Sequence, residues 1–408
     1  MNCGLLGRKL GHSYSPQIHA YLGDYSYELF EQEPDNLSNF LRNGQFSGLN
    51  VTIPYKKEVI PFCAKLSDAA QKLGVVNTIV RQDDGTLIGH NTDYFGFLYT
   101  MKKVGLDVTG KKVLVLGSGG ASATAVAVLK ELGACVITVS RTGENNYTNL
   151  EKHADAALIV NATPVGMYPD TGAAPVALDP FPKLEGVIDV IYNPARTALL
   201  LEAEKRGIVA ENGLWMLVAQ AKESAEWFTG KKISDDIIPY IYKQLCSRML
   251  NIILIGMPGC GKSTVGKLLS EMTGKELIDA DTYLSETAKM SIPDIIHMHG
   301  EDHFRKLETQ ALSELGKRSG LIIATGGGCV TRSENYPLLH QNGTIVWIQR
   351  DIHALPTEGR PLSQSGNLEE MFRIRKPMYK SFCDLSVINQ AEPIAVAEEI
   401  LSRLQQEV

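Results

Sequence analysis

One glycine-rich segment in the second half of the sequence has the residue types and spacing of a phosphate-binding loop. It reads Gly256-x4-Gly261-Lys262-Ser263 and lies between the apolar run NIILIG and the helical pattern VGKLLS. Glycines at these positions let backbone N–H groups point at phosphate oxygens, at the positive end of a helix. Lys262 would neutralise the outer phosphates, and the Ser263 hydroxyl would bind Mg²⁺. The segment therefore predicts a nucleoside triphosphate site made by Gly256, Gly259, Cys260, Gly261, Lys262, Ser263 and Thr264.

A second glycine-rich segment, Gly117-x-Gly119-Gly120-x-Ser122, follows the apolar run KVLVLG and precedes an apolar helical pattern. This order is typical of the pyrophosphate turn of a dinucleotide site. Sites for NAD place an Asp or Glu about 20 residues further on. Here the next strand ends without an acid, and an arginine and two hydroxyls suit a 2′-phosphate, so NADPH is favoured over NADH. The predicted cofactor contacts are Gly117, Gly119, Gly120, Ala121, Ser140, Arg141 and Thr142.

The elements around these loops alternate between strand and helix patterns, which predicts an α/β protein. Residues 1–100 combine short strands with helical stretches at 15–22 and 57–73 and a hairpin turned at Asp84-Gly85. Further strands are expected at 158–163 and 186–192, and helices at 213–228 and 234–250. We expect one lobe at 1–100 completed by 213–247, a Rossmann-type lobe at 101–212, and a P-loop domain at 250–408.

The bulk properties limit the classes of partner. A chain of 408 residues has room for two or three domains of ordinary size. Its net charge of −6 argues against broad nucleic-acid or acidic-membrane binding. The seven cysteines form no CxxC pair, which is typical of reduced thiols in a cytoplasmic protein, and no run is apolar for long enough to span a membrane. We expect small-molecule substrates, and the sequence leaves the oligomeric state open, a homodimer included.

Seven ordered motifs make residues 1–247 resemble the shikimate dehydrogenase family. They are His12-Ser13-Tyr14-Ser15-Pro16, Asn50-Val51-Thr52-Ile53-Pro54-Tyr55-Lys56, Val76-Asn77-Thr78, Gly89-His90-Asn91-Thr92-Asp93, Asn161-Ala162-Thr163-Pro164-Val165-Gly166-Met167, Asp189-Val190-Ile191-Tyr192-Asn193-Pro194 and Met216-Leu217-Val218-Ala219-Gln220-Ala221. Taken singly, such residues are more often helix caps or surface side chains, and only their joint order is specific.

The resemblance implies a substrate-binding α/β lobe, a Rossmann-type NADP lobe and reduction of 3-dehydroshikimate to shikimate. An ammonium beside a carboxylate, Lys56 with Asp93, would stabilise the developing alkoxide and pass a proton to it. The other implied contacts are Thr52, Asn77 and Gln220 for ring hydroxyls, Ser13, Ser15 and Tyr192 for the carboxylate, Asn161 and Thr163 along the cofactor, and Gly213 and Met216 near the nicotinamide.

Residues 250–405 resemble the shikimate kinase family, whose fold is that of the nucleoside-monophosphate kinases. The motifs after the phosphate loop are Leu277-Ile278-Asp279-Ala280-Asp281, Gly300-Glu301-x2-Phe304-Arg305-x2-Glu308, Gly326-Gly327-Gly328, Gly359-Arg360-Pro361-Leu362 and Arg375-x-Pro377-x-Tyr379. The resemblance implies ATP as phosphoryl donor, Asp279 with Ser263 at Mg²⁺, and Asp281 as acceptor for the attacking hydroxyl. It implies Arg305, Arg375, Gly327 and Gly328 around shikimate, and Arg360 in a lid above the transferring phosphoryl group.

Two features of the kinase-like half need separate comment, a departure from the kinase motifs and a group of histidines. The segment 350–360 is shorter than in related kinases, and His353 occupies the position where those kinases have an adenine-stacking arginine. At adenine recognition the sequence therefore departs from the family. His297, His299 and His303 resemble a metal cluster, but they straddle Gly300 and do not share a helical face. We therefore favour solvated histidines over a zinc site.

The two resemblances name consecutive reactions, which predicts one bifunctional enzyme of aromatic amino-acid biosynthesis. One alternative keeps the dehydrogenase and makes the second half a ligand-sensing module without turnover. A second alternative is oxidation of quinate with NAD, against which Arg141 argues.

Overall fold

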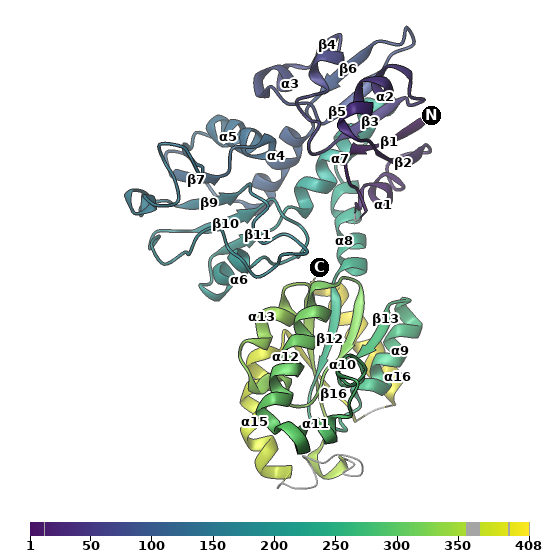
Figure 1. Cartoon of the computed structure of the whole chain (residues 1–408), viewed down its shortest axis with the longest axis vertical. Coiled ribbons are helices and arrows are strands. Elements are labelled where there is room, and N and C mark those ends of the chain that lie inside the picture. Colours follow the sequence, from purple (N-terminus) through teal and green to yellow (C-terminus); the bar gives the residue numbers. More distant parts are fainter. Residues whose placement is uncertain (12, 356–367, 391, 408) are drawn as a thin grey trace. The chain divides into compact units, whose positions relative to one another are not determined.

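The computed structural model describes residues 1–11, 13–355, 368–390 and 392–407 of the chain (Figure 1). By their internal contacts these residues form two compact units. The first unit comprises Met1–Gly166, Ala173–Tyr192 and Leu199–Lys243, and the second comprises Met167–Gly172, Asn193–Ala198 and Gln244–Val408. Helix α8 (Ile237–Met249) contains the boundary between them and is followed after one residue by the strand that precedes the phosphate loop.

The first sheet of the first unit is mixed, with strand order β2-β1-β3-β5-β6-β4. Its strands are β1 (Asn2–Gly7), β2 (Ser26–Glu31), β3 (Gly48–Val51), β4 (Lys65–Leu66), β5 (Thr78–Arg81) and β6 (Leu87–His90). The helices of this part are α1 (Ser15–His19), α2 (Leu37–Asn43) and α3 (Asp68–Leu73). Strands β5 and β6 pair antiparallel through the predicted Asp84-Gly85 turn, where Gly85 has φ +84°. That hairpin is confirmed.

The single helix expected over residues 57–73 is wrong. The structure has a 3₁₀ turn at Ile60–Phe62, then β4, and only then α3. Pro61 has no backbone N–H to continue a helix, and Lys65 and Leu66 pair instead with β6 as an edge strand. A new helix begins after Ser67, whose side chain accepts a hydrogen bond from the N–H of Ala70 at 3.3 Å.

The second sheet of the first unit is fully parallel, with order β11-β10-β9-β7-β8. Its strands are β7 (Lys112–Leu116), β8 (Cys135–Val139), β9 (Leu158–Asn161), β10 (Gly186–Asp189) and β11 (Val209–Glu211), and its helices are α4 (Asp93–Val104), α5 (Gly120–Glu131) and α6 (Ala198–Lys205). Val113 and Val115 of β7 pack in a cluster with α4 and α5, whereas Leu114 and Leu116 pack in a second cluster with α6. This period of two buries both faces of β7, as a parallel sheet requires, and the predicted Rossmann-type arrangement is confirmed.

Helix α7 (Leu214–Thr229) follows the second sheet in sequence but packs against β5 and α1 of the first part. It also lies along α4, where Gly96 allows a close approach: a Cβ at Gly96 would be 2.6 Å from the carbonyl oxygen of Met216. Asn50 of β3 and Ser224 of α7, separated by 174 positions, are joined by a hydrogen bond of 2.7 Å. Helix α7, near the end of the first unit in sequence, therefore covers one side of the first sheet.

The second unit has one parallel sheet with order β13-β14-β12-β15-β16. Its strands are β12 (Asn251–Ile255), β13 (Glu276–Asp279), β14 (Leu321–Ala324), β15 (Gly343–Gln349) and β16 (Leu385–Ile388). Its helices are α9 (Lys262–Thr273), α10 (Ala280–Ala288), α11 (Ile292–His299), α12 (Glu301–Lys317), α13 (Asn335–His340), α15 (Leu368–Phe382) and α16 (Pro393–Glu407).

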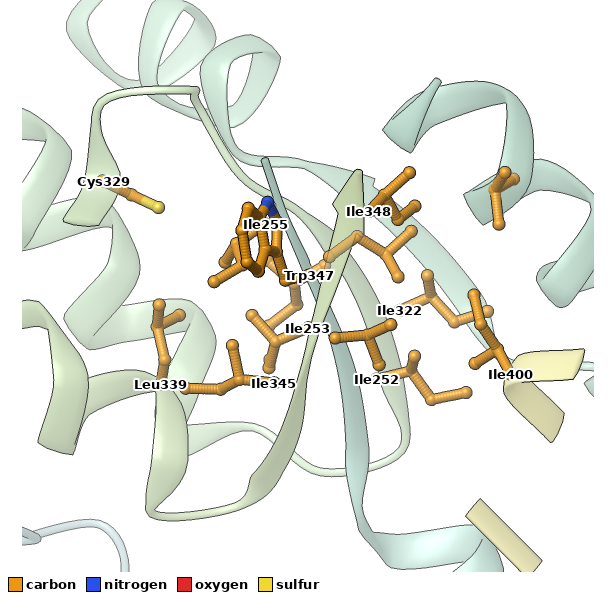
Figure 2. Packing of buried hydrophobic residues seen from close by; sticks show 14 of the residues in the cluster. Ile252, Ile253, Ile255, Ile322, Cys329, Leu339, Ile345, Trp347, Ile348 and Ile400 are labelled. Atoms are coloured by element: carbon orange, nitrogen blue, oxygen red, sulfur yellow. The ribbon is translucent and has the colours of Figure 1, made fainter. Parts of the chain in front are cut away.

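Apolar side chains fill both faces of this sheet. Ile252 points to one side of β12 with Ile400, and Ile253 points to the other side with Leu339 (Figure 2). Strand β12 is central, so the loop that follows it is anchored in the most buried part of the unit.

No helix in the part of the chain that the structure describes is long and apolar enough to cross a membrane. All seven cysteines lie in this part and are free thiols.

Candidate functional site

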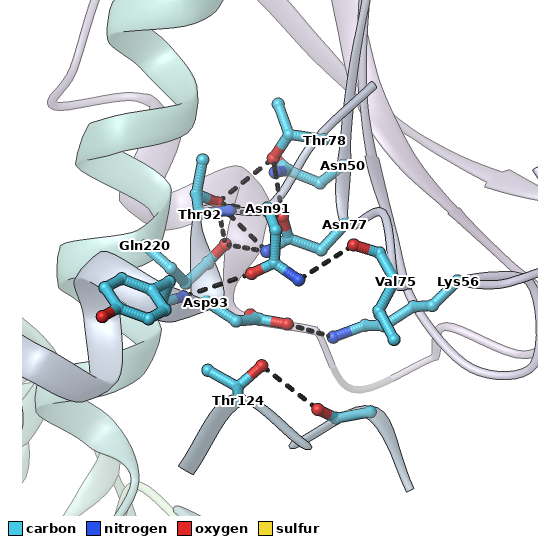
Figure 3. A network of polar contacts seen from close by, with 12 residues as sticks. Asn50, Lys56, Val75, Asn77, Thr78, Asn91, Thr92, Asp93, Thr124 and Gln220 are labelled. Carbon is cyan, nitrogen blue, oxygen red and sulfur yellow. Dashed lines mark hydrogen bonds and ion pairs between the residues drawn. The ribbon is translucent and has the colours of Figure 1, made fainter. Parts of the chain in front are cut away.

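The shortest contact between predicted site residues in the first unit joins Lys56 to Asp93. Lys56 Nζ donates to Asp93 Oδ2 at 2.6 Å, with the two side chains 22% and 8% exposed (Figure 3). Lys56 lies in the loop after β3, and Asp93 is the first residue of α4. A nearly buried carboxylate therefore holds an ammonium group in one place, as proton transfer to a substrate oxygen requires.

Two amide side chains beside this pair have fixed orientations. Thr92 N–H donates to Asn77 Oδ1 at 2.7 Å, so the Asn77 amide group presents its N–H₂. Gln220 donates its own N–H₂ to the Leu217 carbonyl at 2.9 Å, so its Oε1 faces the other way, 3.5 Å from Asn77 Nδ2. One donor and one acceptor, held side by side, fit a hydroxyl group that accepts one hydrogen bond and donates another.

A group of hydroxyls comes from the N-terminal loop and from the segment after β10. Ser13 Oγ donates to Ser15 Oγ at 3.1 Å, and the Ser15 N–H donates to Ser13 Oγ at 3.2 Å. The Tyr192 ring meets the Tyr14 ring edge-on, with centroids 6.0 Å apart, and burial raises the pKa of Tyr192 to about 12. These neutral O–H groups suit a carboxylate ligand. Thr52 follows β3, and its N–H donates to the Leu6 carbonyl at 2.9 Å.

The glycine-rich segment at 117–120 lies next to the lysine. Helix α5 begins at Gly120 with Gly119 as its N-cap and Ala121 in its first turn. A Cβ at Gly120 would be 3.3 Å from Val75 and 3.8 Å from Lys56 Cδ. Gly117 has φ +111°, and a Cβ there would lie 2.9 Å from the Ala162 carbonyl oxygen, so only glycine fits. The positive end of a 12-residue helix thus opens beside the Lys56–Asp93 pair.

The remaining predicted cofactor residues follow the ends of parallel strands. Asn161, at the end of β9, donates to both oxygens of Asp189 at 3.0 and 3.1 Å, and its Oδ1 accepts from the N–H and the hydroxyl of Thr163. Ser140, Arg141 and Thr142 follow β8, the last two exposed. Gly213 is the N-cap of α7, and Met216 is buried in its first turn. These positions follow the carboxyl ends of the strands, where a dinucleotide binds in this kind of sheet.

The phosphate loop of the second unit uses three glycines with positive φ, namely Gly256 at +144°, Gly259 at +83° and Gly261 at +103°. Lys262 is buried, and its Nζ donates to the carbonyls of Gly256 at 2.9 Å and Met257 at 3.1 Å. Thr264 is exposed, and Cys260 is fully buried under the loop. The arrangement fits a triphosphate, because the ammonium group is bonded to neutral groups of its own loop, the two carbonyls and the Cys260 sulfur at 4.0 Å, which a phosphate oxygen could replace.

Ser263 and Asp279 are the only predicted metal ligands, and they are in contact. Ser263 Oγ donates to Asp279 Oδ2 at 3.1 Å, while Asp279 Oδ1 accepts from the N–H groups of Asp281 and Thr282 and caps α10. A hydroxyl and a carboxylate next to a phosphate loop are a donor set that Mg²⁺ accepts.

Asp281 lies among charged groups on α10 and α12. A Cβ at Gly326 would be 2.7 Å from both Asp281 Oδ1 and Glu308 Oε1, so the two carboxyl groups face the same glycine. Arg305 Nη1 donates to Glu308 Oε2 at 2.8 Å, and its Nη2 donates to Glu301 Oε1 at 2.9 Å. Burial, and then the charges of Glu308 and Asp279, raise the pKa of Asp281 to about 6, against the opposing effect of Lys262 and Arg305. Glu308 was not among the predicted site residues, although the motif that contains Arg305 also contains it.

A cleft of about 810 Å³ brings most of the predicted kinase residues together. Arg375 Nη1 donates to the Gly327 carbonyl at 3.1 Å, and a Cβ at Gly328 would clash with the Arg305 guanidinium at 2.2 Å. The predicted residues that line the cleft are Gly259, Gly261, Lys262, Ser263, Thr264, Asp279, Asp281, Arg305, Gly327, Gly328 and Arg375. Arg350 also lines it, whereas the predicted lid residue Arg360 lies outside the described residues.

Comparison with known proteins matches both parts of the chain. The family model described as shikimate dehydrogenase substrate binding domain matches residues 5–79, and that of shikimate kinase matches residues 258–405. The shikimate dehydrogenase (NADP(+)) of Shouchella clausii is 38% identical over 256 residues, which cover 56% of this chain and 93% of the relative.

Two solved structures of shikimate dehydrogenases are also similar to this chain. Shikimate dehydrogenase 1 of Peptoclostridium difficile is 36% identical with a TM-score of 0.56, covering 60% of this chain and 97% of that one. Shikimate 5-dehydrogenase of Thermus thermophilus, in complex with NADP(H) and shikimate, is 32% identical with a TM-score of 0.55, covering 60% and 99%.

Proposed function

Because the chain belongs to the shikimate dehydrogenase family and carries a shikimate kinase domain in its second half, we propose that it catalyses two consecutive reactions. The first is reduction of 3-dehydroshikimate to shikimate with NADPH, and the second is phosphorylation of shikimate at its 3-hydroxyl with ATP. Residues 1–100 with 213–247 would bind the first substrate, 101–212 the dinucleotide, and 250–408 would act as the kinase. The free thiols support a reducing, cytoplasmic setting.

The dehydrogenase proposal depends on one observation, the 2.6 Å contact between Lys56 Nζ and Asp93 Oδ2 beside the start of α5. NADPH, when bound, supplies the hydride. Lys56 stabilises the alkoxide oxygen that forms at the former ketone and gives it a proton, while Asp93 keeps the ammonium group in place. Asn77 and Gln220 bind a ring hydroxyl as donor and acceptor, and the hydroxyls of Ser13, Ser15, Thr52 and Tyr192 bind the remaining polar groups of the substrate.

The preference for NADPH would come from the segment after β8. Arg141 is exposed, directly follows the strand–turn junction, and has hydroxyl neighbours at 140 and 142. A guanidinium can bind a 2′-phosphate in bidentate fashion. Comparing NADP with NAD at fixed shikimate tests this point, and a preference for NAD would favour the alternative of quinate oxidation.

The kinase proposal depends on the convergence of the phosphate loop, Asp281 and two arginines on one cleft. Asp281 accepts the proton of the attacking hydroxyl, Arg305 and Arg375 bind the substrate carboxylate, and Lys262 leaves its main-chain partners for the phosphate oxygens. Ser263 and Asp279 would hold Mg²⁺, which, when bound, neutralises phosphate charge.

A coupled assay of ADP release with shikimate and ATP tests the kinase against the alternative of a ligand-sensing module. Turnover that disappears without shikimate would support the kinase. Binding of shikimate and ATP without ADP release would support the sensing module, and a time course from 3-dehydroshikimate with both cosubstrates would then stop at shikimate.

A further inference from the structure

A row of buried polar side chains lies behind the substrate residues of the first unit, and none of its members has a role in the reaction as described above. Asn50 is its centre: Oδ1 accepts from the Tyr27 hydroxyl at 2.8 Å, and Nδ2 donates to Ser224 Oγ at 2.7 Å and Thr78 Oγ1 at 3.2 Å. Asn50 is 5% exposed, and Ser224 is fully buried. Water therefore does not compete for these hydrogen bonds.

Three hydroxyls continue the row toward the substrate residues. Ser224 Oγ lies 2.9 Å from both Thr78 Oγ1 and Thr92 Oγ1, and the two threonine hydroxyls are 3.1 Å apart. Thr92 Oγ1 also accepts a hydrogen bond from Asn77 Nδ2 at 3.0 Å, and the main-chain N–H of Thr92 donates to Asn77 Oδ1 at 2.7 Å. Figure 3 shows Asn50, Thr78, Thr92, Asn77 and Gln220 converging in this way.

We propose that Tyr27, Asn50 and Ser224 are positioning residues for the dehydrogenase reaction, which fix the orientation of the Asn77 and Gln220 amides that bind a substrate hydroxyl. The proposal rests on the dehydrogenase function given above. It adds residues from β2, β3 and α7 that are not among the proposed substrate and cofactor contacts.

The physical basis is the direction of each hydrogen bond. The two ends of an amide group have nearly the same shape, so only its partners decide which end points where. The Tyr27 O–H donates to Asn50 Oδ1, and this leaves the Asn50 N–H₂ as donor to Ser224. Without the Tyr27 hydroxyl, Asn50 can turn over, Ser224 must then donate to it, and the protons of the threonine hydroxyls rearrange around Asn77.

The other end of the row reaches the serines of the N-terminal loop. Burial raises the pKa of Tyr27 well above its usual value, and a hydrogen bond with Ser15 partly opposes that rise. The ring of Tyr27 is held independently of its hydroxyl, because it stacks on His19 with centroids 4.0 Å apart and planes inclined by 11°. Removing only the hydroxyl should therefore leave the fold in place.

The experiment measures oxidation of shikimate by NADP in the full chain without ATP, so that the kinase half is silent. For Tyr27→Phe we expect the KM for shikimate to rise roughly fivefold to tenfold, the effect of one lost buried hydrogen bond, with kcat and the KM for NADP within about twofold. Ser224→Ala should do the same. In the double variant the two effects should fail to multiply, because both substitutions break one connected row.

Tyr55→Phe is the matched control, since the Tyr55 side chain is also buried and its hydroxyl donates to the main-chain carbonyl of Gln32, which is not a member of the row. An equal rise in KM in this control, an unchanged KM in Tyr27→Phe, or effects that multiply in the double variant would each overturn the proposed link and leave the dehydrogenase function intact. Should Ser224→Ala not fold, Tyr27→Phe and its control still decide. No shikimate oxidation in the unmodified chain would overturn the dehydrogenase function and the proposal with it.

Discussion

The two candidate sites hold their lysines in different ways. Lys56 is paired with a carboxylate at 2.6 Å, whereas Lys262 is bonded to two main-chain carbonyls of its own loop. The carboxyl groups of the second site, Asp281 and Glu308, gather instead around Gly326. The first arrangement suits proton exchange, while the second suits the binding of a polyanion such as a triphosphate.

Removal of divalent metal should have the most different effects on the two activities. Chelation with excess EDTA should reduce phosphoryl transfer to the uncatalysed background, because Ser263 and Asp279 then have no cation to share with the phosphates. Shikimate oxidation should change by less than about twofold, since nothing in the proposed proton step uses a metal. Restoring Mg²⁺ is the control, and loss of both activities on chelation would contradict the separation.

Replacing Lys56 by Ala should lower the kcat of the dehydrogenase by roughly 10³-fold, within the range for losing a positioned proton donor. Binding of NADPH, followed by fluorescence titration, and ADP release by the kinase should both stay near normal. Near-normal dehydrogenase turnover in this variant would remove Lys56 from the mechanism.

The kinase should depend on the ionisation of Asp281. Because burial raises the pKa of this carboxyl to about 6, the acceptor form is lost as the pH falls through 6, and kcat/KM for shikimate should fall tenfold per pH unit below that value. Asp281→Asn should lower kcat by about 10²-fold and abolish the acidic limb. A limb of the same midpoint in the variant would assign it to another group.

The smallest effect concerns the cofactor. Arg141→Ala should raise the KM for NADPH by roughly 10-fold to 30-fold, the value of a charge-assisted hydrogen bond to a phosphate, and leave the KM for NADH unchanged. Lys130→Ala, which removes an exposed cation in the last turn of α5, is the matched control. Equal losses for both cofactors would place Arg141 outside the 2′-phosphate site.

Local patterns allowed much of the fold to be predicted. The strand β7, the turn at 117–120 and helix α5 are adjacent in sequence, and so are β12, the phosphate loop and α9, so spacing alone identifies them. The error at 57–73 arose because a proline and an edge strand of two residues interrupt a pattern that otherwise has helical spacing.

The sites were predictable where a motif names a residue and were missed where tertiary contacts decide. Glu308 and Asn50 each lie inside a motif, yet neither had an expected role, because the groups that show it come from elsewhere in the chain: Asp281 and Gly326 for Glu308, and Ser224 for Asn50. Ser224 had no sequence signal beyond its place four positions after Gln220, one helical turn away.

The hydrogen bond between Asn50 and Ser224 has a consequence for synthesis of the protein. The 174 positions between them take roughly 10–35 s to translate at the usual rate of about 5–20 residues per second. During that interval α7 is not yet available to pack against the first sheet. Water can therefore reach the amide of Asn50 and the hydroxyl of Thr78. The shikimate pocket can therefore close only after the dinucleotide lobe has left the ribosome.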